Sequence, residues 1–426
     1  MLTVWGSVIL LATVFVVVAM GKIEAAVISL LAAVVVLATG VLGQAEAFAA
    51  IDWNTIFLLV GMMMVVAVAK KTGLFQYLAI RSAKAARGNP LLILLFFPAI
   101  TALISAFLDN VTTVLLIAPV TILIADSLEL DPVPFLIAEA IASNIGGTAT
   151  LIGDPPNIMI GSAAGLGFNA FILNLTPVIL VIQLAFSLLL YLLFRRRFHV
   201  NPELKAGIME MDENRAITDP HLTRVSLTIL GLILIGFVCH QQLGLEPATI
   251  ALAGATLLLF LSQVPSLEIF QEVEWTTIFF FIGLFIVVAA VDKQGVFAFL
   301  GHSILGLTEG HLLLTALLVL WISAFAAAFV GAVPFVASMI PLLKAVTAQM
   351  PSHAIILWWA LSLGACLGGN GTLTGAAANM VVADIARKND RPISYLNFFR
   401  WGFPVMLLSL LISSLYIFLR CLYCPR

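Results

Sequence analysis

The chain has 426 residues, of which 62% are hydrophobic and only 10% charged, with a formal net charge of −2 and a mean hydropathy of +1.14. Soluble domains are about 45–50% apolar and about 25% charged, so this chain carries more apolar surface than a soluble fold can bury. The composition excludes a soluble enzyme, a nucleic-acid-binding protein and a disulfide-stabilised scaffold. The apolar runs are continuous rather than alternating, which excludes a β-barrel as well.

Hydropathy predicts an all-α polytopic membrane protein, because a helix needs about 20 apolar residues to cross the hydrocarbon core. The first crossing has no basic segment before it and no obvious cleavage site, so we expect a retained helix rather than a signal peptide. The predicted crossings are residues 3–20, 24–42, 53–70, 134–162 (interrupted), 171–194, 222–241, 247–264, 275–292, 353–383 (interrupted) and 402–420.

Two further apolar stretches, 91–125 and 311–345, are each too long for a single crossing. Each has a weak point near its middle, at Asp109-Asn110 in the first and at 331–334 in the second. We therefore predict two re-entrant hairpins, each made of two half-depth helices that meet at a tip. The expected architecture is about 10 crossings plus 2 hairpins.

The chain also repeats itself when it is aligned with a shift of 222 residues. One offset holds over more than a hundred residues, and chance similarity between leucine-rich helices does not produce that. The matches include Trp53 with Trp275, Gly61 with Gly283, Pro119 with Pro341, Gly147 with Gly369, Thr150 with Thr372 and Asn157 with Asn379.

Five crossings and one hairpin in each half make the second half start on the opposite side of the membrane. Such an inverted repeat is typical of secondary transporters. The expected parts are a first repeat at 1–194, a cytoplasmic linker at 195–221 and a second repeat at 222–426. Of the 20 basic residues, only Lys293, Lys344, Arg420 and Arg426 then fall outside, which fits the positive-inside rule for an inner (plasma) membrane protein with both termini extracytoplasmic.

Three acids lie within apolar stretches: Asp109, Glu139 and Asp154. An acid at the centre of a membrane helix costs about 2.5–3.5 kcal/mol, so it normally faces a cavity or a partner. We predict that these acids couple transport to protons, and that neutralising Asp109 or Glu139 abolishes that coupling. Structural alternatives stay open, because Asp109 and Asp154 could only cap helices and Glu139 could only bond to freed backbone groups.

The segment 144–157 breaks its crossing, because Gly146, Gly147 and Gly153 weaken a helix and Pro155 cannot continue one. Unpaired backbone at membrane depth is tolerated only around a cavity or inside protein. The second half repeats the break at 364–379. Two breaks and two hairpin tips are therefore expected to converge on one site.

The repeat is asymmetric in charge, since all three acids belong to the first half. At the shift of 222, Asp109 falls on Gly331, Glu139 on Leu361 and Asp154 on Ala376. An acidic half facing a neutral polar half suits a neutral or weakly polar solute that is exchanged against protons.

The other polar residues are not expected to take part in chemistry. Asp52 and Glu274 start matching crossings beside tryptophan, so we expect them to act as interfacial anchors. The Cys421/Cys424 pair lacks a second ligand pair for zinc, and the histidines show no metal spacing. We therefore expect no metal site and no cofactor.

Two motifs resemble those of the ArsB/NhaD group of the ion transporter superfamily, which includes arsenite permeases, sodium/proton antiporters and the melanosomal P protein. They are Asp109-Asn-Val-Thr-Thr with Pro119, and Asn144-Ile-Gly-Gly-Thr-Ala-Thr-Leu-Ile-Gly-Asp-Pro-Pro-Asn157. The resemblance is strong over about 50–170 and weaker in the second repeat. The group often has Asp-Asn before the second-half proline, where this chain has 331–334 as Gly-Ala-Val-Pro, so a sodium site at that position is in doubt.

The resemblance implies scaffold and transport subdomains that are each built from both halves, an elevator-like motion and a homodimer. An energising ATPase subunit is a further candidate partner, beside lipid, protons and a small inorganic solute. Cys366 is a candidate for one soft contact to the solute. The residues implied to surround the solute are Asn110, Thr112, Thr113, Asn144, Gly147, Thr148, Thr150, Asn157, Asn370, Thr372 and Asn379.

Within this group, efflux of arsenite or antimonite in exchange for protons is the leading interpretation, because their trivalent hydroxides are neutral and present hydroxyl groups. The alternatives are a sodium/proton antiporter, a carboxylate or anion carrier, and an uncoupled channel. An intramembrane enzyme would need a nucleophile and a base. No such pair occurs within the spans, so the chain is not expected to be an enzyme.

Overall fold

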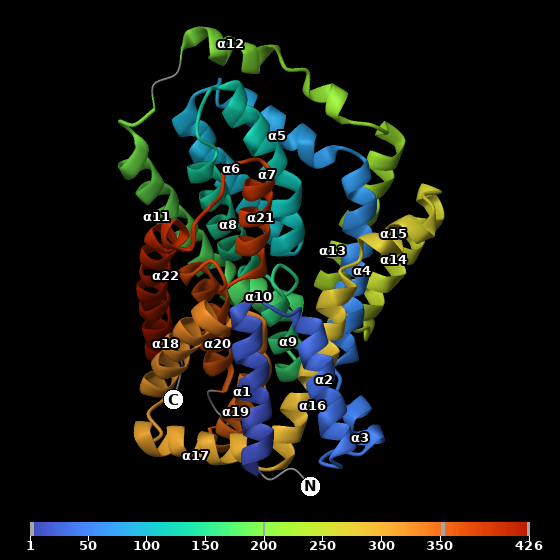
Figure 1. The fold of residues 1–426 in the computed structure, drawn as a ribbon, viewed down its shortest axis with the longest axis vertical. Helices are drawn as coiled ribbons and strands as arrows, with labels where there is room; N and C mark the ends of the chain where they lie inside the picture. The colour runs from blue at the N-terminus through green and yellow to red at the C-terminus, as the bar shows by residue number, and fades with distance from the viewer. Residues whose placement is uncertain (1–3, 199–200, 351–353, 424–426) are drawn as a thin grey trace.

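The computed structural model describes residues 4–198, 201–350 and 354–423, and every regular element in these ranges is a helix (Figure 1). The predicted fold class, an all-α polytopic membrane protein, is confirmed. The first half contains α1 (Val4–Met20), α2 (Ala25–Ala38), α3 (Gln44–Ala49), α4 (Trp53–Lys71), α5 (Leu74–Ala85), α6 (Pro90–Ser105), α7 (Asn110–Ser127), α8 (Val133–Gly147), α9 (Pro155–Ala164), α10 (Phe168–Asn174) and α11 (Thr176–Phe194).

The linker and the second half complete the chain. The linker holds α12 (Pro202–Glu210) and the short 3₁₀ helix η1 (Glu213–Ala216). The second half contains α13 (Pro220–Leu243), α14 (Pro247–Ser262), α15 (Ser266–Glu272), α16 (Trp275–Lys293), α17 (Val296–Thr308), α18 (Leu312–Val330), α19 (Ala332–Gln349), α20 (Ala354–Gly368), η3 (Gly369–Gly371), α21 (Ala377–Lys388) and α22 (Tyr395–Tyr423).

Within the described ranges, eight helices are long and apolar enough to cross a membrane: α4, α7, α11, α13, α16, α18, α19 and α22. Three helices predicted as crossings are shorter, namely α1 with 17 residues, α2 with 14 and α14 with 16. The inverted topology relative to the membrane, the side of the termini and the dimer stay predictions.

The repeat is visible in the helices themselves. Helices α4 and α16 begin and end at positions related by the shift of 222, and each is followed by a glycine with left-handed φ, +76° at Gly73 and +77° at Gly295. Only glycine adopts that conformation without strain, so both helices end there. Figure 1 shows α4 leading up to α5 and α16 leading down to α17, so the equivalent helices run in opposite directions.

Helices of the first half pack closely against helices of the second half. A Cβ atom added to Gly61 on α4 would lie 2.8 Å from the backbone of Ala251 on α14, and one added to Gly283 on α16 would lie 2.6 Å from the backbone of Ser29 on α2. These four positions are related by the same shift of 222. Small residues thus allow α4 to cross α14, and α16 to cross α2, at close range.

The predicted interruptions are confirmed. Residues 148–154 separate α8 from α9, and residues 369–376 separate α20 from α21. The predicted hairpin tips are also bends, because α7 begins at Asn110 and α19 begins at Ala332. The arms differ from the half-depth helices expected, since α7, α18 and α19 have 18 or 19 residues and are each long enough to cross. The weak points mark where the arms start but do not limit their length.

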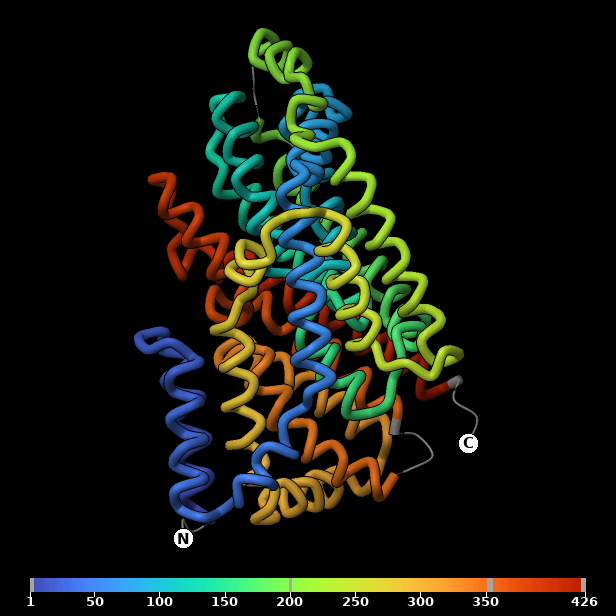
Figure 2. Tube along the Cα trace, turned by 90° about the vertical axis from the view of Figure 1, so that its right-hand side faces the viewer, coloured from blue at the N-terminus to red at the C-terminus, as the bar shows by residue number. Residues whose placement is uncertain are grey.

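Several helices lie outside the predicted crossings. Helices α5 and α17 are equivalent in the two halves and lie at opposite ends of the view in Figure 1. Figure 2 shows the linker arching over one end of the molecule, while the first residues of α1 lie at the other end. Cys424 of the Cys421/Cys424 pair and Arg426 lie outside the described residues.

Candidate functional site

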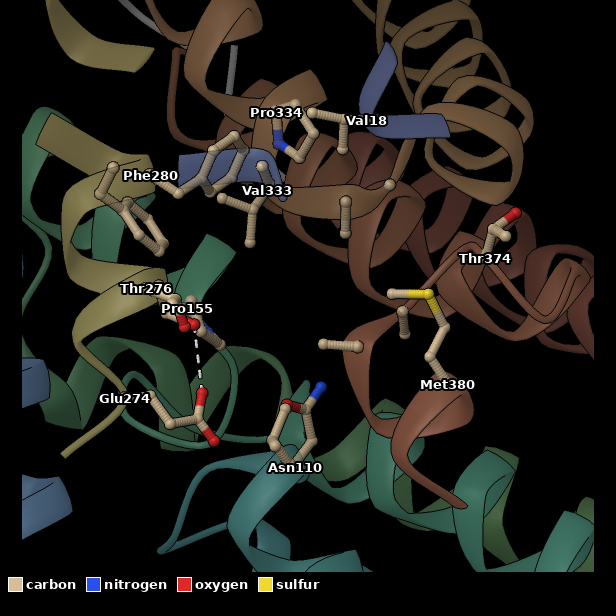
Figure 3. Close-up of a pocket in the computed structure, with 18 of the residues that line it drawn as sticks. Val18, Asn110, Pro155, Glu274, Thr276, Phe280, Val333, Pro334, Thr374 and Met380 are labelled. Carbon is tan, nitrogen blue, oxygen red and sulfur yellow. Dashed lines mark hydrogen bonds between the residues drawn. The ribbon is translucent and has the colours of Figure 1, made fainter. Parts of the chain in front are cut away.

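A cavity of about 350 Å³ lies where the N-terminal ends of six helices meet: α2, α7, α9, α16, α19 and α21. The two hairpin tips and both breaks contribute to it, so the predicted convergence is seen. Figure 3 shows Asn110 and Glu274 on one side of this cavity and Val333 and Pro334 on the opposite side. Helix N-termini carry partial positive charge and unsatisfied N–H groups, which attract oxygen atoms.

One wall of the cavity is acidic. Asp109 caps α7 and accepts a hydrogen bond from the backbone N–H of Thr112 at 2.8 Å. Asp154 is 5% exposed and precedes α9, and its Oδ1 accepts from the side-chain amide of Asn110 at 3.3 Å. Glu274 precedes α16 and accepts from the Thr277 hydroxyl at 3.1 Å. Part of the N-terminal charge of these helices is therefore compensated by carboxyl groups.

The opposite wall is neutral. Helix α19 starts after Gly331 and helix α21 after Ala376, and neither residue provides a side-chain cap. The N–H group of Ala332 donates to the Gly375 carbonyl at 3.3 Å, which ties the second tip to the second break. The two walls thus differ in charge, but they do not coincide with the two halves, because Glu274 of the second half belongs to the acidic wall.

A network of buried amides lies behind the cavity and joins the halves. The side-chain amide of Asn110 donates to Asn144 Oδ1 at 3.1 Å. The amide of Asn144 donates in turn to Asn370 Oδ1 and to Asn379 Oδ1, each at 2.9 Å. Within the described residues Asn370 Nδ2 has no hydrogen-bond partner. The network thus connects the first tip to the second break through hydrogen bonds.

Equivalent asparagines hold the two breaks together. The amide of Asn157 donates to the carbonyls of Thr148 and Thr150 at 3.1 and 2.9 Å. The amide of Asn379 donates to the carbonyls of Gly369 and Thr372 at 2.8 and 3.0 Å. A broken helix leaves such carbonyls unpaired, and these amides satisfy them.

The hydroxyls of Thr150 and Thr372 make equivalent hydrogen bonds from each break to a hairpin. Thr150 donates to the Ala106 carbonyl and Thr372 to the Ala328 carbonyl, so each break is tied to the hairpin of its own half. Gly147 packs against the break as well, since a Cβ atom there would lie 2.6 Å from the Gly153 carbonyl oxygen.

Of the predicted site residues, Asp109, Asn110 and Asp154 line the cavity, together with Cys366. The others lie behind its wall and make the contacts that hold the tips and breaks. Thr113 donates to the Asp109 carbonyl at 2.9 Å, and Thr148 donates to the Asn144 carbonyl at 2.7 Å. The predicted residues that do not line the cavity are Thr112, Thr113, Glu139, Asn144, Gly147, Thr148, Thr150, Asn157, Asn370, Thr372 and Asn379.

Glu139 lies apart from the cavity, between α8 and α7. It is fully buried, and Thr121 on α7 donates a hydrogen bond to its Oε1. Its Oε2 has no partner among the described residues.

Glu274, for which the sequence predicts an interfacial anchor, also forms part of the cavity wall. Its equivalent Asp52 caps α4, with both carboxylate oxygens accepting from Thr55. Glu274 instead lines the cavity together with Thr276 and Thr277. The one available signal was the Thr276-Thr277 pair beside the acid, since two hydroxyls next to a carboxyl at a helix start can also serve a polar cavity.

A second cavity, of about 600 Å³, is the repeat-related counterpart of the first. It meets the other end of α9, through Ile158 and Gly161, whereas Pro155 of the same helix lines the first cavity. Residues that line the first cavity are related by the shift of 222 to residues that line the second. Adding 222 relates Val18 to His240, Ala19 to Gln241, Glu24 to Glu246 and Ala25 to Pro247. Subtracting 222 relates Thr276 to Asn54, Phe280 to Leu58 and Met380 to Ile158.

The helical architecture and this interior cavity define a polytopic membrane transporter. Residues 15–364 match the model of the CitMHS family, described as a citrate transporter, and the chain belongs to this family. The family and the two mycobacterial relatives below are described as transporters or membrane proteins, not as enzymes.

Three relatives are similar in sequence to most of this chain. It is 45% identical over 374 residues to the 46 kDa membrane protein of Mycobacterium leprae, covering 87% of both chains. An uncharacterized transporter of Mycobacterium tuberculosis is 45% identical over 372 residues, covering 87% of this chain and 86% of the relative. The human P protein is 33% identical over 86% of this chain, which spans 53% of that longer protein.

The fold is similar to that of a solved structure, the YdaH transporter of Alcanivorax borkumensis. The TM-score is 0.62 and the match covers 90% of each chain, at 14% sequence identity. At this identity the likeness concerns the arrangement of the helices alone.

Proposed function

We propose that the chain is a proton-coupled secondary transporter whose solute binds in the cavity lined by Asp109, Asn110 and Asp154. One observation carries this proposal. The described lining residues include four acids, Glu24, Asp109, Asp154 and Glu274, and no Lys, Arg or His. Ionised carboxylates are costly in a low-dielectric interior, so binding and release of protons there is the natural way to change the charge of the site.

The solute that suits this site best is the neutral hydroxide of trivalent arsenic or antimony, exported in exchange for protons. Its hydroxyl groups can donate to the carboxyls of Asp109 and Asp154, and its oxygens can accept from N–H groups at the starts of α19 and α21. A neutral solute needs no cationic side chain. The resemblance of Asp109–Thr113 and Asn144–Asn157 to the arsenite permeases supports the same choice.

A carboxylate is the second candidate. The family model is described as a citrate transporter. Six helix N-termini meet at one cavity, and only that of α7 has a side-chain cap hydrogen bond, which also favours an anion. A carboxylate facing four acids would have to enter together with protons or a cation that neutralises them.

We infer alternating access from the pair of repeat-related cavities. The two cavities meet opposite ends of α9, so a movement of the tips and breaks relative to α4 and α16 would close one cavity and open the other. At the second cavity, the side-chain amide of Asn54 donates a hydrogen bond to Glu246 Oε2 at 3.3 Å. The equivalent Glu24 and Thr276 at the first cavity share no hydrogen bond among the described residues. An elevator-like motion of α6–α9 and α18–α21 would use this difference.

The test is transport by the purified protein in proteoliposomes that enclose a pH-sensitive dye. Arsenite, antimonite, citrate and sodium are offered in turn, and solute counterflow and internal pH are recorded together. We expect arsenite and antimonite to move protons in the opposite direction. Protein-free vesicles provide the control for passive leak.

The other results assign other functions. Proton movement with citrate alone would favour the carboxylate carrier. A sodium gradient that moves protons without any other solute would indicate a sodium/proton antiporter. Flux of solute with no proton movement would indicate a channel and overturn the proposal.

A further inference from the structure

Glu274 lies between the main cavity and a smaller one of about 40 Å³. The smaller cavity is lined by Met63 and Lys70 of α4, Thr112 of α7, and Glu272 and Glu274 before α16. A water molecule needs about 10–15 Å³ of such space, so this cavity has room for a short file of water. Glu274 is therefore the carboxyl that both cavities share.

The outer end of the small cavity reaches the surface at an ion pair. Lys70 Nζ lies 2.7 Å from Glu272 Oε2, and the two side chains are 45% and 43% exposed. The inner end reaches the solute site, because Thr112 also holds Asp109 through a 2.8 Å hydrogen bond. Polar groups thus stand at the surface and at the acidic wall, and the rest of the small cavity is lined by Met63, Val66, Ala67, Leu115 and Leu116.

The repeat shows that this arrangement is not needed to build the fold. The nearby pair Lys71–Glu268 has an equivalent in the other half, Lys293–Glu46. Lys70 and Glu272 fall instead on Asp292 and Ala50, which cannot form an ion pair. Glu274 falls on Asp52, whose oxygens are both occupied by Thr55.

We propose that Glu274 carries protons between the surface and the solute site, by a route through the small cavity that the solute does not use. This inference rests on the proposed proton coupling. The Glu274 carboxylate takes a proton from water in the small cavity and releases it, through water in the main cavity, to the carboxylate of Asp109 or Asp154. The other charged and titratable groups that face this route are Glu24, Lys70, Asp109, Asp154, Glu272 and the thiol of Cys366.

The test compares Glu274→Gln with Asp52→Asn, the same type of change at the equivalent position. Two reactions are measured in proteoliposomes: solute counterflow, which needs no net proton movement, and solute transport driven by a pH gradient. For Glu274→Gln we expect gradient-driven transport to fall about 100-fold while counterflow stays near the native rate. Asp52→Asn should leave both reactions near native rates, because asparagine also caps a helix.

Three outcomes separate the two proposals. Native gradient-driven transport in Glu274→Gln would overturn the role of Glu274 and leave the proposed function standing. An equal loss of counterflow would also overturn it, because Glu274 would then be part of the solute site. Solute transport by the native protein without proton movement would overturn the proposed function as well.

A second pair of variants tests the outer end of the route. Lys70→Ala removes the ion pair at the mouth of the small cavity, and Lys71→Ala removes the neighbouring pair that does not line it. We expect Lys70→Ala to speed the proton leak measured without solute and Lys71→Ala to leave it unchanged. The same leak in both variants would contradict an entry at Lys70.

Discussion

The two halves of this transporter share one frame but differ in the chemistry they bring to the cavity. The asparagine and threonine that hold each break occur in both, as Asn157 with Asn379 and Thr150 with Thr372. The carboxyls at the first tip and first break have no counterpart, since Asp109 and Asp154 fall on Gly331 and Ala376. The repeated residues therefore hold the breaks that border the cavity, and the unrepeated carboxyls give the first tip and first break their acidic character.

The largest effect is expected for Asp109→Asn, which tests whether the unrepeated acid at the first tip takes part in coupling. Asparagine caps α7 about as well as aspartate does, so the tip should keep its shape while it loses a titratable group. We expect proton-driven transport to fall about 100-fold, with an unchanged midpoint of thermal unfolding in detergent. Coupled transport at the native rate would show that the unrepeated acid at the tip has no part in coupling.

The repeated frame is tested by Asn157→Ala and Asn379→Ala. Each change leaves two break carbonyls without their amide donor, so each should lower the free energy of unfolding by about 1–3 kcal/mol. The measurement is chemical unfolding in detergent. Asn174→Ala is the control, because that amide bonds only to the Ala170 carbonyl of its own turn, at 2.7 Å. A large loss for Asn157→Ala alone would mean that the second break does not depend on its asparagine.

The smallest expected effect concerns the repeated ion pairs at the surface. A hydrogen bond from Lys293 is the main cause that holds the pKa of Glu46 below its ordinary value of 4.5. The carboxylate form is thus favoured in the folded protein, and its contribution is present at neutral pH and disappears as the pH falls below that value. Lys293→Ala should lower the unfolding midpoint by about 1 °C at pH 7 and by less at pH 3. An equal difference at both pH values would exclude the ion pair as its cause.

Sequence patterns locate the frame well because its signals are local. Glycines and prolines at 146–156 break a helix wherever they stand, and Asp109 is a residue type that commonly caps the start of a helix. The offset of 222 carries these features into the second half, where the structure shows the second break and the second tip. Local chemistry is enough for such features.

The cavity itself depends on packing between distant segments, which the sequence does not show. Glu274 meets Thr112 and Lys70 only because the start of α16 lies against α4 and α7. In the same way Glu139 looks equivalent to Asp109 as an acid in an apolar stretch, and yet the structure separates it from the cavity. Which side of a helix faces the site is decided by its neighbours.

The close crossings of α4 with α14 and of α16 with α2 have a consequence for how the chain is made. When α4 leaves the ribosome, the helix that covers Gly61 has not yet been synthesised, and almost 200 further residues must follow before Ala251 arrives. The first half must therefore wait in the bilayer with these surfaces of α2 and α4 uncovered until α14 and α16 insert. A nascent chain stalled before α14 would offer those bare surfaces to the insertion machinery and to quality-control proteases.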